Sequence, residues 1–221
     1  MQNFNNFIAH VWQDKRILDS YSAKANKQLQ QIFSELSHTA NVVLDLNGEG
    51  ACSNALAQIG CDVHVLSDTN IPEVDTLVAF DEVFTYAASE TEQFDLIRNA
   101  VAYIATGGLL LTSIRDYRNN PVHKRNIGDA TSCQVGSHHY LIVEAQMPSV
   151  KDKQQWHQTN FVIADATVAT DYTIGMRRTL YFKQLAKYCH DLGCRQFGVV
   201  KDQFWRSPWR RQPEHIIWAR F

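Results

Sequence analysis

The sequence lacks features typical of several protein classes, and each absence argues against one class. Its five cysteines are scattered, and none forms a Cys-x-x-Cys pair of the kind that builds a zinc cage. Lysine and arginine number 21 against 23 acidic residues, so the basic excess typical of nucleic-acid binders is missing. No apolar run approaches the roughly 18 residues of a membrane span. We therefore expect reduced thiols, no metal site, no nucleic-acid partner and no membrane span.

The first ten residues have no basic start and no apolar segment, so we expect a cytoplasmic protein without a secretory leader. The chain is 221 residues long, with 45% hydrophobic and 20% charged residues, which is ordinary for a soluble globular protein. No internal repeat or low-complexity block interrupts it. The composition favours a single enlarged domain over residues 1–221.

Helical and strand patterns alternate in the first half of the chain. Helices are expected at residues 12–36, 52–59 and 90–106, the last one ended by Gly107-Gly108. Strands are expected at residues 41–46, 62–67, 80–86 and 109–114. The first strand meets the glycine turn Gly48-Glu49-Gly50 before a helix begins. This alternation indicates a parallel α/β sheet.

The pattern changes in the second half. Polar and apolar residues alternate at 140–144 and 161–168, with polar turns between such runs, which is typical of antiparallel strands. We expect residues 119–177 to form an inserted antiparallel β cover. The remaining elements are a helix at 178–192 and strands at 196–200 and 215–221.

In this order the segments resemble the class I S-adenosylmethionine-dependent methyltransferases, over about residues 20–221. The family's first motif is a strand that ends in an acid and enters a glycine loop, here Val42-Val43-Leu44-Asp45-Leu46-Asn47-Gly48-Glu49-Gly50. Phe80-Asp81-Glu82-Val83 looks like the family's fourth strand, and residues 105–111 look like the approach to its fifth. The resemblance implies a Rossmann-like, mostly parallel sheet whose last strand is antiparallel, with an N-terminal helical cap at residues 1–38.

A narrower likeness concerns the acceptor. Ser113-Ile114-Arg115-Asp116-Tyr117 is similar to the Arg-Asn/Asp-Tyr segment of the glycine N-methyltransferase-like branch, and residues 178–181 and 215–220 also fit that branch. There a small-molecule acceptor binds beneath an antiparallel cover, and the matching arginine binds its carboxylate. The resemblance implies N- or O-methylation of a small, carboxylate-bearing metabolite, with Arg115, Tyr117 and Tyr181 binding and orienting it.

The resemblance also implies S-adenosylmethionine as the cofactor. Asp45 would meet its amino group, directly or through water, and an acid after the second strand would accept hydrogen bonds from the ribose. Asp68 is the available acid, one place later than usual, and Ser67 occupies the usual place. The implied cofactor residues are Asp45, Asn47, Gly48, Gly50, Ser67, Asp68 and Thr85.

Each feature also has a structural interpretation. Asp45 suits a helix cap and Asp68 suits a turn. Arg115 suits an ion pair with Asp116 or Glu144. The adjacent histidines at 138 and 139 would point to opposite faces of a strand, so they do not easily share a metal. The Trp/Arg-rich run at 205–211 fits a turn or a subunit contact better than a single-stranded nucleic-acid site.

One departure from the family stands out. Only 12 residues separate Asp68 from Asp81 (81 − 68 − 1). The family places a helix and a strand there, and a crossover needs at least about 10–12 residues before the strand is counted. We expect one or both elements to be missing, which leaves open a catalytically inactive scaffold that binds a metabolite or a protein.

A dinucleotide oxidoreductase is a third interpretation, but its G-x-G-x-x-G fingerprint ends in Ser53 here. The oligomeric state is open, and a homodimer is among the expected assemblies.

Overall fold

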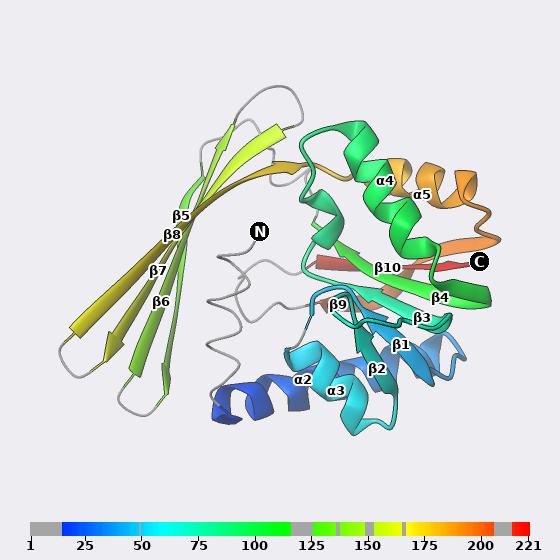
Figure 1. Cartoon of the computed structure of the whole chain (residues 1–221), viewed down its shortest axis with the longest axis horizontal. Helices are drawn as coiled ribbons and strands as arrows, with labels where there is room; N and C mark the ends of the chain where they lie inside the picture. Colours follow the sequence, from blue (N-terminus) through cyan, green and yellow to red (C-terminus); the bar gives the residue numbers. More distant parts are fainter. Residues whose placement is uncertain are drawn as a thin grey trace.

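The computed structural model describes residues 15–48, 50–115, 126–135, 138–148, 153–164, 167–205 and 214–221. Its strands form two sheets, one of six strands and one of four. Figure 1 shows the four-stranded sheet standing beside a body in which helices cover the six-stranded sheet. Among the described residues, no helix is both long and apolar enough to cross a membrane.

The six-stranded sheet has the order β2-β1-β3-β4-β10-β9. Strands β1 to β4 run parallel to one another, whereas β10 is antiparallel to both β4 and β9. The strands are β1 (Val42–Asp45), β2 (Asp62–Val65), β3 (Val74–Ala79), β4 (Ile104–Ile114), β9 (Gln196–Trp205) and β10 (Glu214–Arg220). The predicted mostly parallel sheet with an antiparallel last strand is confirmed.

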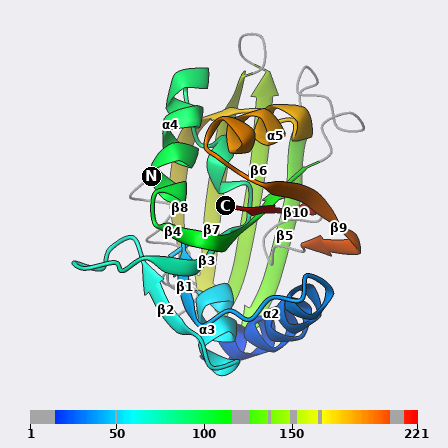
Figure 2. The same cartoon turned by 90° about the vertical axis from the view of Figure 1, so that its right-hand side faces the viewer.

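Among the described residues, two helices cover each face of this sheet. Figures 1 and 2 show α2 (Lys15–Glu35) and α3 (Ala51–Gln58) on one face, with α4 (Glu90–Val101) and α5 (Phe182–Asp191) on the other. Each face has its own cluster of buried apolar side chains. Leu29 and Leu56 belong to the first cluster, and Ile97 and Leu185 belong to the second. Burial of these leucine and isoleucine side chains holds the helices to the sheet.

The connection from β2 to β3 is short and irregular. All of residues 66–73 are described, and none of them lies in a helix or a strand. Strand β2 pairs only with β1 among the described residues, so it forms the edge of the sheet. Residues 66–73 hold neither of the two elements that the resemblance places after the second strand, which agrees with the prediction that one or both would be missing.

The third strand was predicted at residues 80–86, and this prediction is wrong. The strand is β3, at Val74–Ala79, and a 3-10 turn (η1, Val83–Thr85) follows it. Asp75 and Thr76 interrupt the apolar pattern of this strand. Thr76 is fully buried, and its hydroxyl donates to Asp75 Oδ1 over 2.7 Å. The polar side chains thus satisfy each other within the strand.

Gly107-Gly108 do not end a helix, contrary to the prediction. Helix α4 ends at Val101, and the glycines lie in β4 where its register against β3 shifts. A Cβ on Gly108 would stand 2.6 Å from Ile104 Cγ2 and 3.0 Å from the Asp75 carbonyl oxygen. Because Ile104 and Ala105 of β4 itself and Asp75 of β3 all crowd this position, the irregularity requires glycine at 108.

The four-stranded sheet is an antiparallel meander in chain order. Its strands are β5 (Asn126–Val135), β6 (His138–Pro148), β7 (Lys153–Ala164) and β8 (Thr167–Arg178). Antiparallel strands are thus present where the sequence predicted an inserted cover at 119–177. The helix predicted at 178–192 begins later, at Phe182, because Arg178 still belongs to β8. The division into one domain with a cap and a cover stays a prediction.

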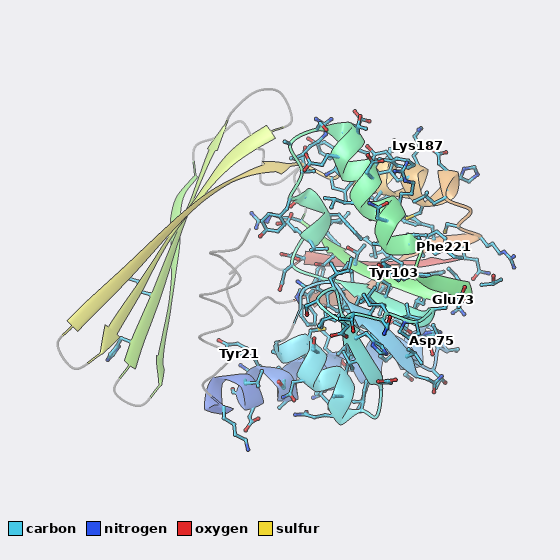
Figure 3. The ribbon with its side chains drawn as sticks, viewed as in Figure 1. Tyr21, Glu73, Asp75, Tyr103, Lys187 and Phe221 are labelled. Atoms are coloured by element: carbon cyan, nitrogen blue, oxygen red, sulfur yellow. The ribbon has the colours of Figure 1, made fainter. Side chains whose placement is uncertain are left out.

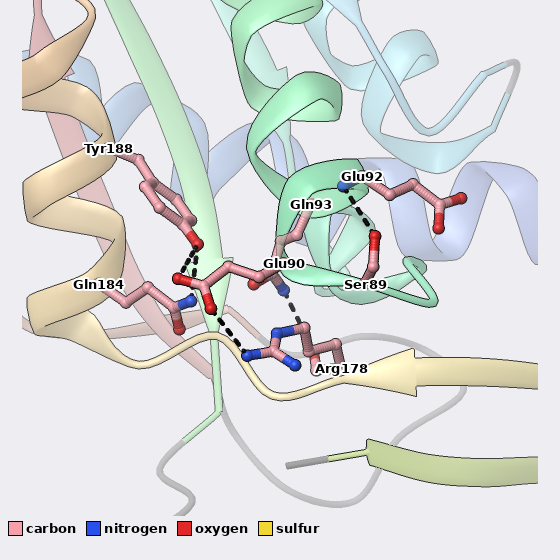
Figure 4. Close-up of polar contacts among 7 residues, drawn as sticks. All are labelled: Ser89, Glu90, Glu92, Gln93, Arg178, Gln184 and Tyr188. Carbon is pink, nitrogen blue, oxygen red and sulfur yellow. Dashed lines mark hydrogen bonds and ion pairs between the residues drawn. The ribbon is translucent and has the colours of Figure 1, made fainter. Parts of the chain in front are cut away.

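Polar contacts anchor the end of β8 to the start of α4 (Figure 4). Arg178 Nη2 lies 3.3 Å from Glu90 Oε2, and Tyr188 donates to Glu90 Oε1 over 3.2 Å. Gln93 Nε2 donates to the Arg178 carbonyl at 3.2 Å and to the Phe84 carbonyl at 3.1 Å. These contacts fix the point at which the four-stranded sheet leaves the body.

Candidate functional site

The carboxyl ends of β1, β3 and β4 meet at one end of the six-stranded sheet, and this end faces the four-stranded sheet (Figure 1). The opposite end carries Glu73, Asp75, Tyr103 and Phe221 (Figure 3). Open α/β sheets bind ligands beyond the carboxyl ends of their strands. Asp45, Glu82 and Arg115 lie at this end, which makes it the candidate site.

Asp45 ends β1 and is fully buried. Its Oδ1 accepts a hydrogen bond from the Asn47 backbone N–H at 3.0 Å, and its Oδ2 accepts one from the Ser53 hydroxyl at 2.6 Å. Burial raises the pKa of Asp45 to about 6, although both hydrogen bonds oppose this effect and the Asp81 charge adds to it. A buried carboxyl group with a shifted pKa beside a loop is a candidate functional group.

The glycine loop after Asp45 has two properties that suit a ligand. Gly48 has a φ of 79°, a left-handed conformation that glycine adopts without strain. Gly50 is the N-cap of α3 and, having no side chain, makes no side-chain cap hydrogen bond to the first N–H groups of that helix. Such N–H groups and the helix dipole favour an anionic ligand. Asn47 ties the loop to the end of β3 by donating to the Phe80 carbonyl at 3.0 Å.

The turn after β3 is strained and aims two carboxylates in different directions. Asp81 and Glu82 have φ values of 57° and 55°, in the left-handed region that few non-glycine residues adopt. Asp81 Oδ1 accepts a hydrogen bond from Trp205 Nε1 at 2.8 Å. Glu82 Oε2 lies 3.2 Å from Arg115 Nη2. Strain of about 1–3 kcal/mol per residue is typical of positions that the surrounding structure fixes for function.

Arg115 and Glu82 form a buried ion pair, with side chains only 8% and 1% exposed. The sequence-based structural interpretation named Asp116 or Glu144 as the partner of Arg115. Among the described residues its partner is Glu82, in a segment that had been assigned to a strand. Asp116 lies outside the described residues, so a pairing with Asp116 or Glu144 stays a prediction. Removing one member of such a pair leaves a buried charge without its counter-charge, which is strongly destabilising.

A further buried acid, Glu214, lies at this end of the sheet. Glu214 begins β10, is fully buried, and accepts a hydrogen bond from the Ser113 hydroxyl. Because β10 is antiparallel to β4, its first residue lies at the carboxyl end of β4. Asp45, Glu82 and Glu214 thus place three buried acids at this end, and Arg115 balances the charge of Glu82.

Sequence reasoning missed Glu82, Glu214 and Trp205 as members of this cluster. Placing the third strand at Val74–Ala79 would have put Asp81 and Glu82 just beyond its carboxyl end. The position of Asp81 and Glu82 directly after a strand could therefore have identified them as site residues. The wrong strand bounds of 80–86 placed both acids inside the strand instead.

The residues predicted to meet the ribose lie in the connection from β2 to β3. Asp68 Oδ2 accepts a hydrogen bond from the Val65 N–H at 2.9 Å and lies 3.5 Å from His64 Nδ1. This contact agrees with the turn interpretation of Asp68. Ser67 is exposed beside it. A role of either residue at the ribose stays a prediction.

The remaining predicted residues differ in their surroundings. Thr85 is buried, and its hydroxyl donates to the Glu82 carbonyl at 2.8 Å. Tyr181 immediately precedes α5 and is 43% exposed. Tyr117 lies outside the described residues. The structure therefore brings Asp45, Arg115 and the turn that carries Thr85 to one end of the sheet. In the described part of the chain, no group of three or more His, Cys, Asp or Glu could hold a metal ion.

Comparison with solved structures identifies the fold. An S-adenosylmethionine-dependent methyltransferase from Clostridium acetobutylicum ATCC 824 superimposes with a TM-score of 0.66 at 13% identity, over 99% of this chain and 98% of that chain. A second similar structure is S-adenosylmethionine-bound CalS10, an amino pentose methyltransferase of calicheamicin biosynthesis from Micromonospora echinaspora. It superimposes with a TM-score of 0.64 at 12% identity, over 96% of this chain and 97% of that chain.

The sugar N-methyltransferase KedS8 from Streptoalloteichus gives a TM-score of 0.60 at 11% identity, over 90% of this chain and 87% of that chain. The chain thus has the Rossmann-like fold of these methyltransferases, and identities this low establish the fold alone. No protein-family model matches the sequence, and no curated protein matches it.

Proposed function

We propose that this chain is an S-adenosylmethionine-dependent methyltransferase that methylates a nitrogen or oxygen atom of a small molecule. The observation that carries the proposal is the buried Asp45 carboxyl group at the end of β1, directly before the left-handed Gly48. Burying an acid costs stability, which a cationic ligand can offset. The cofactor carries such charges in its ammonium and sulfonium groups.

The described residues fit the amino-acid portion of this cofactor. Asp45 would face the ammonium group, and the uncapped N–H groups of α3 after Gly50 would face the carboxylate. Gly48 lets the backbone of the loop turn toward the ligand, and Asn47 holds the loop against β3. Ser67, Asp68 and Thr85 complete the proposed cofactor residues. When bound, S-adenosylmethionine supplies the electrophilic methyl group.

The acceptor would bind between Arg115, Tyr117 and Tyr181. Arg115 stands just beyond the carboxyl end of β4, and its guanidinium can hold an oxygen-bearing group of the acceptor. Methyl transfer is an in-line displacement, so these residues contribute mainly by holding the acceptor atom in line with the methyl group. The amino pentose and sugar named for CalS10 and KedS8 are small molecules, which supports a small-molecule acceptor here.

A second candidate is a methyltransferase-like scaffold that binds a metabolite or a protein without turnover. The observation that favours it is the direct connection of β2 to β3 through residues 66–73. This connection carries Ser67 and Asp68, the residues proposed to bind the ribose. Without the missing helix and strand, less of the chain surrounds the proposed ribose site.

Both candidates can be separated by one experiment. The chain is incubated with S-adenosylmethionine carrying an isotope-labelled methyl group and a panel of small amines and alcohols, with and without a carboxylate. Label transfer to a panel compound, lost in Asp45→Asn, supports the enzyme. Binding of S-adenosylhomocysteine without transfer favours the scaffold, and no binding of either nucleoside at millimolar concentration contradicts the proposed cofactor site.

A further inference from the structure

We infer that Glu82 is a positioning residue, whose buried carboxylate fixes the Arg115 guanidinium in the orientation that meets the acceptor. The inference rests on the proposed function, because it specifies how the acceptor side of that site is built. Glu82 stands in the segment matched to the family's fourth strand, but the sequence analysis gave it no role at the site.

The strand register brings the two residues together. Ala79 of β3 pairs with Thr112 of β4, and the Thr112 hydroxyl donates to the Ala79 carbonyl at 2.7 Å. Glu82 and Arg115 each follow three residues after this pair. Their side chains then meet at 3.2 Å between Oε2 and Nη2. The pair is therefore set by two adjacent parallel strands rather than by a loose surface contact.

The turn that carries Glu82 is held on several sides. The Thr85 hydroxyl and the Thr85 N–H both donate to the Glu82 carbonyl at 2.8 Å. Trp205 Nε1 binds the neighbouring Asp81, and Gln93 Nε2 binds the Phe84 carbonyl at 3.1 Å. These contacts hold Glu82 in its left-handed conformation, so its carboxylate is aimed before any ligand arrives.

The residue type itself points to a role in positioning. The left-handed region suits glycine, asparagine and aspartate, and a glutamate there adds strain that a glycine would avoid. Buried ion pairs often give little net stability over apolar residues. What a carboxylate gives a planar guanidinium is a fixed orientation, and small displacements of a binding group can cost up to about 100-fold in rate.

The test is the substitution Glu82→Gln, which keeps the side-chain volume and removes the charge. Glu90→Gln is the control, because it makes the same change in the more exposed Glu90–Arg178 pair, which joins the start of α4 to the end of β8. Three quantities are measured for each variant. They are S-adenosylhomocysteine affinity by calorimetry, kcat and KM for the panel compound with the highest turnover, and rotation of the Arg115 guanidinium by 15N NMR, assigned with Arg115→Lys.

We expect E82Q to reduce kcat/KM for the acceptor by about 10- to 100-fold, with faster guanidinium rotation and S-adenosylhomocysteine affinity within about twofold of wild type. E90Q should match the wild type in all three. If E82Q does not fold, Glu82→Asp keeps the charge but shortens the side chain, and it should show the same loss in part. A folded E82Q with unchanged guanidinium rotation, or with unchanged kcat/KM, overturns the inference.

Failure of the proposed function is distinguishable from failure of this inference. It would show as a wild-type chain that binds no S-adenosylhomocysteine, and the NMR comparison would still decide whether Glu82 orients Arg115.

Discussion

The Ser53 hydroxyl lies between two acceptors, 2.6 Å from Asp45 Oδ2 and 2.9 Å from the Gly48 carbonyl oxygen. A hydroxyl has one proton to donate. When Asp45 is ionised, Ser53 donates to it. When Asp45 is protonated, Asp45 donates to Ser53, and Ser53 turns its proton to Gly48. Both protonation states of Asp45 are thus hydrogen-bonded, so its charge can change while the glycine loop keeps its contacts.

The first prediction concerns pH and stability. The pKa of Asp45 is about 6 in the folded chain, against an ordinary value of 3.8, so between these values the folded state binds more protons than the unfolded state. The free energy of unfolding therefore falls as pH rises through this window, by about 3 kcal/mol from this group. Asp45→Asn removes the effect.

Urea denaturation of wild type and D45N at pH values from 4 to 7 measures it. As pH rises, the free energy of unfolding of the wild type should fall by about 3 kcal/mol relative to that of D45N. A difference that stays constant over this range would show that Asp45 titrates as an ordinary carboxyl group.

A second prediction concerns the contact between Trp205 and Asp81. Trp205 stacks on Phe80 with ring centroids 4.2 Å apart and donates its indole N–H to Asp81. Trp205→Phe keeps most of the stack and removes the donor, so it should lower the free energy of unfolding by about 1–3 kcal/mol.

Chemical denaturation of W205F, Asp81→Ala and the double variant isolates the hydrogen bond. We expect the two substitutions to be clearly non-additive. Additive effects would mean that the contact contributes nothing to the strained turn.

A third prediction separates stability from the site. At the opposite end of the sheet, the Thr76 hydroxyl contacts His38 Nε2 at 2.7 Å and donates to Asp75 Oδ1 at 2.7 Å. Thr76→Val leaves these polar groups without their shared partner, and about 1–3 kcal/mol of stability should be lost. S-adenosylhomocysteine affinity should not change, and calorimetry checks this. A large loss of affinity in folded T76V would place the site elsewhere.

A fourth prediction tests Asp68. Asp68→Asn retains an oxygen for the Val65 N–H and removes the charge. If Asp68 binds the ribose, S-adenosylhomocysteine affinity should fall by about tenfold or more, since hydrogen bonds to charged groups contribute about 1.5–3 kcal/mol. Ser67→Ala is the neighbouring control, expected to have the smaller effect. Unchanged affinity in D68N would contradict the ribose role and leave the turn role as the remaining interpretation of Asp68.

Much of the fold followed from the sequence because its signals are local. The apolar run that ends in Asp45 and the glycine turn after it predicted β1 and α3 within about one residue. The spacing of Asp68 and Asp81 predicted the missing elements. Element order was enough to predict the methyltransferase fold.

The errors arose where tertiary structure overrides local pattern. Asp75 and Thr76 interrupt the apolar pattern of β3, yet their side chains bond to each other and to neighbouring segments inside a buried strand. Gly107 and Gly108 look like a helix end, yet they lie in β4, where Gly107 has a φ of 85° and a Cβ on Gly108 would clash with neighbouring atoms. The Glu82–Arg115 pair joins residues 33 positions apart in sequence (115 − 82). No local pattern reveals such a pair before the strand register is known.

The most direct test of the central claim is calorimetric titration of the wild-type chain and D45N with S-adenosylmethionine, with thermal unfolding alongside. We predict saturable binding to the wild type, weaker binding to D45N, and a rise in Tm of about 5–10 °C when ligand reaches about 100 times Kd. No heat of binding and no Tm shift at millimolar S-adenosylmethionine, in a folded wild-type chain, would contradict the account.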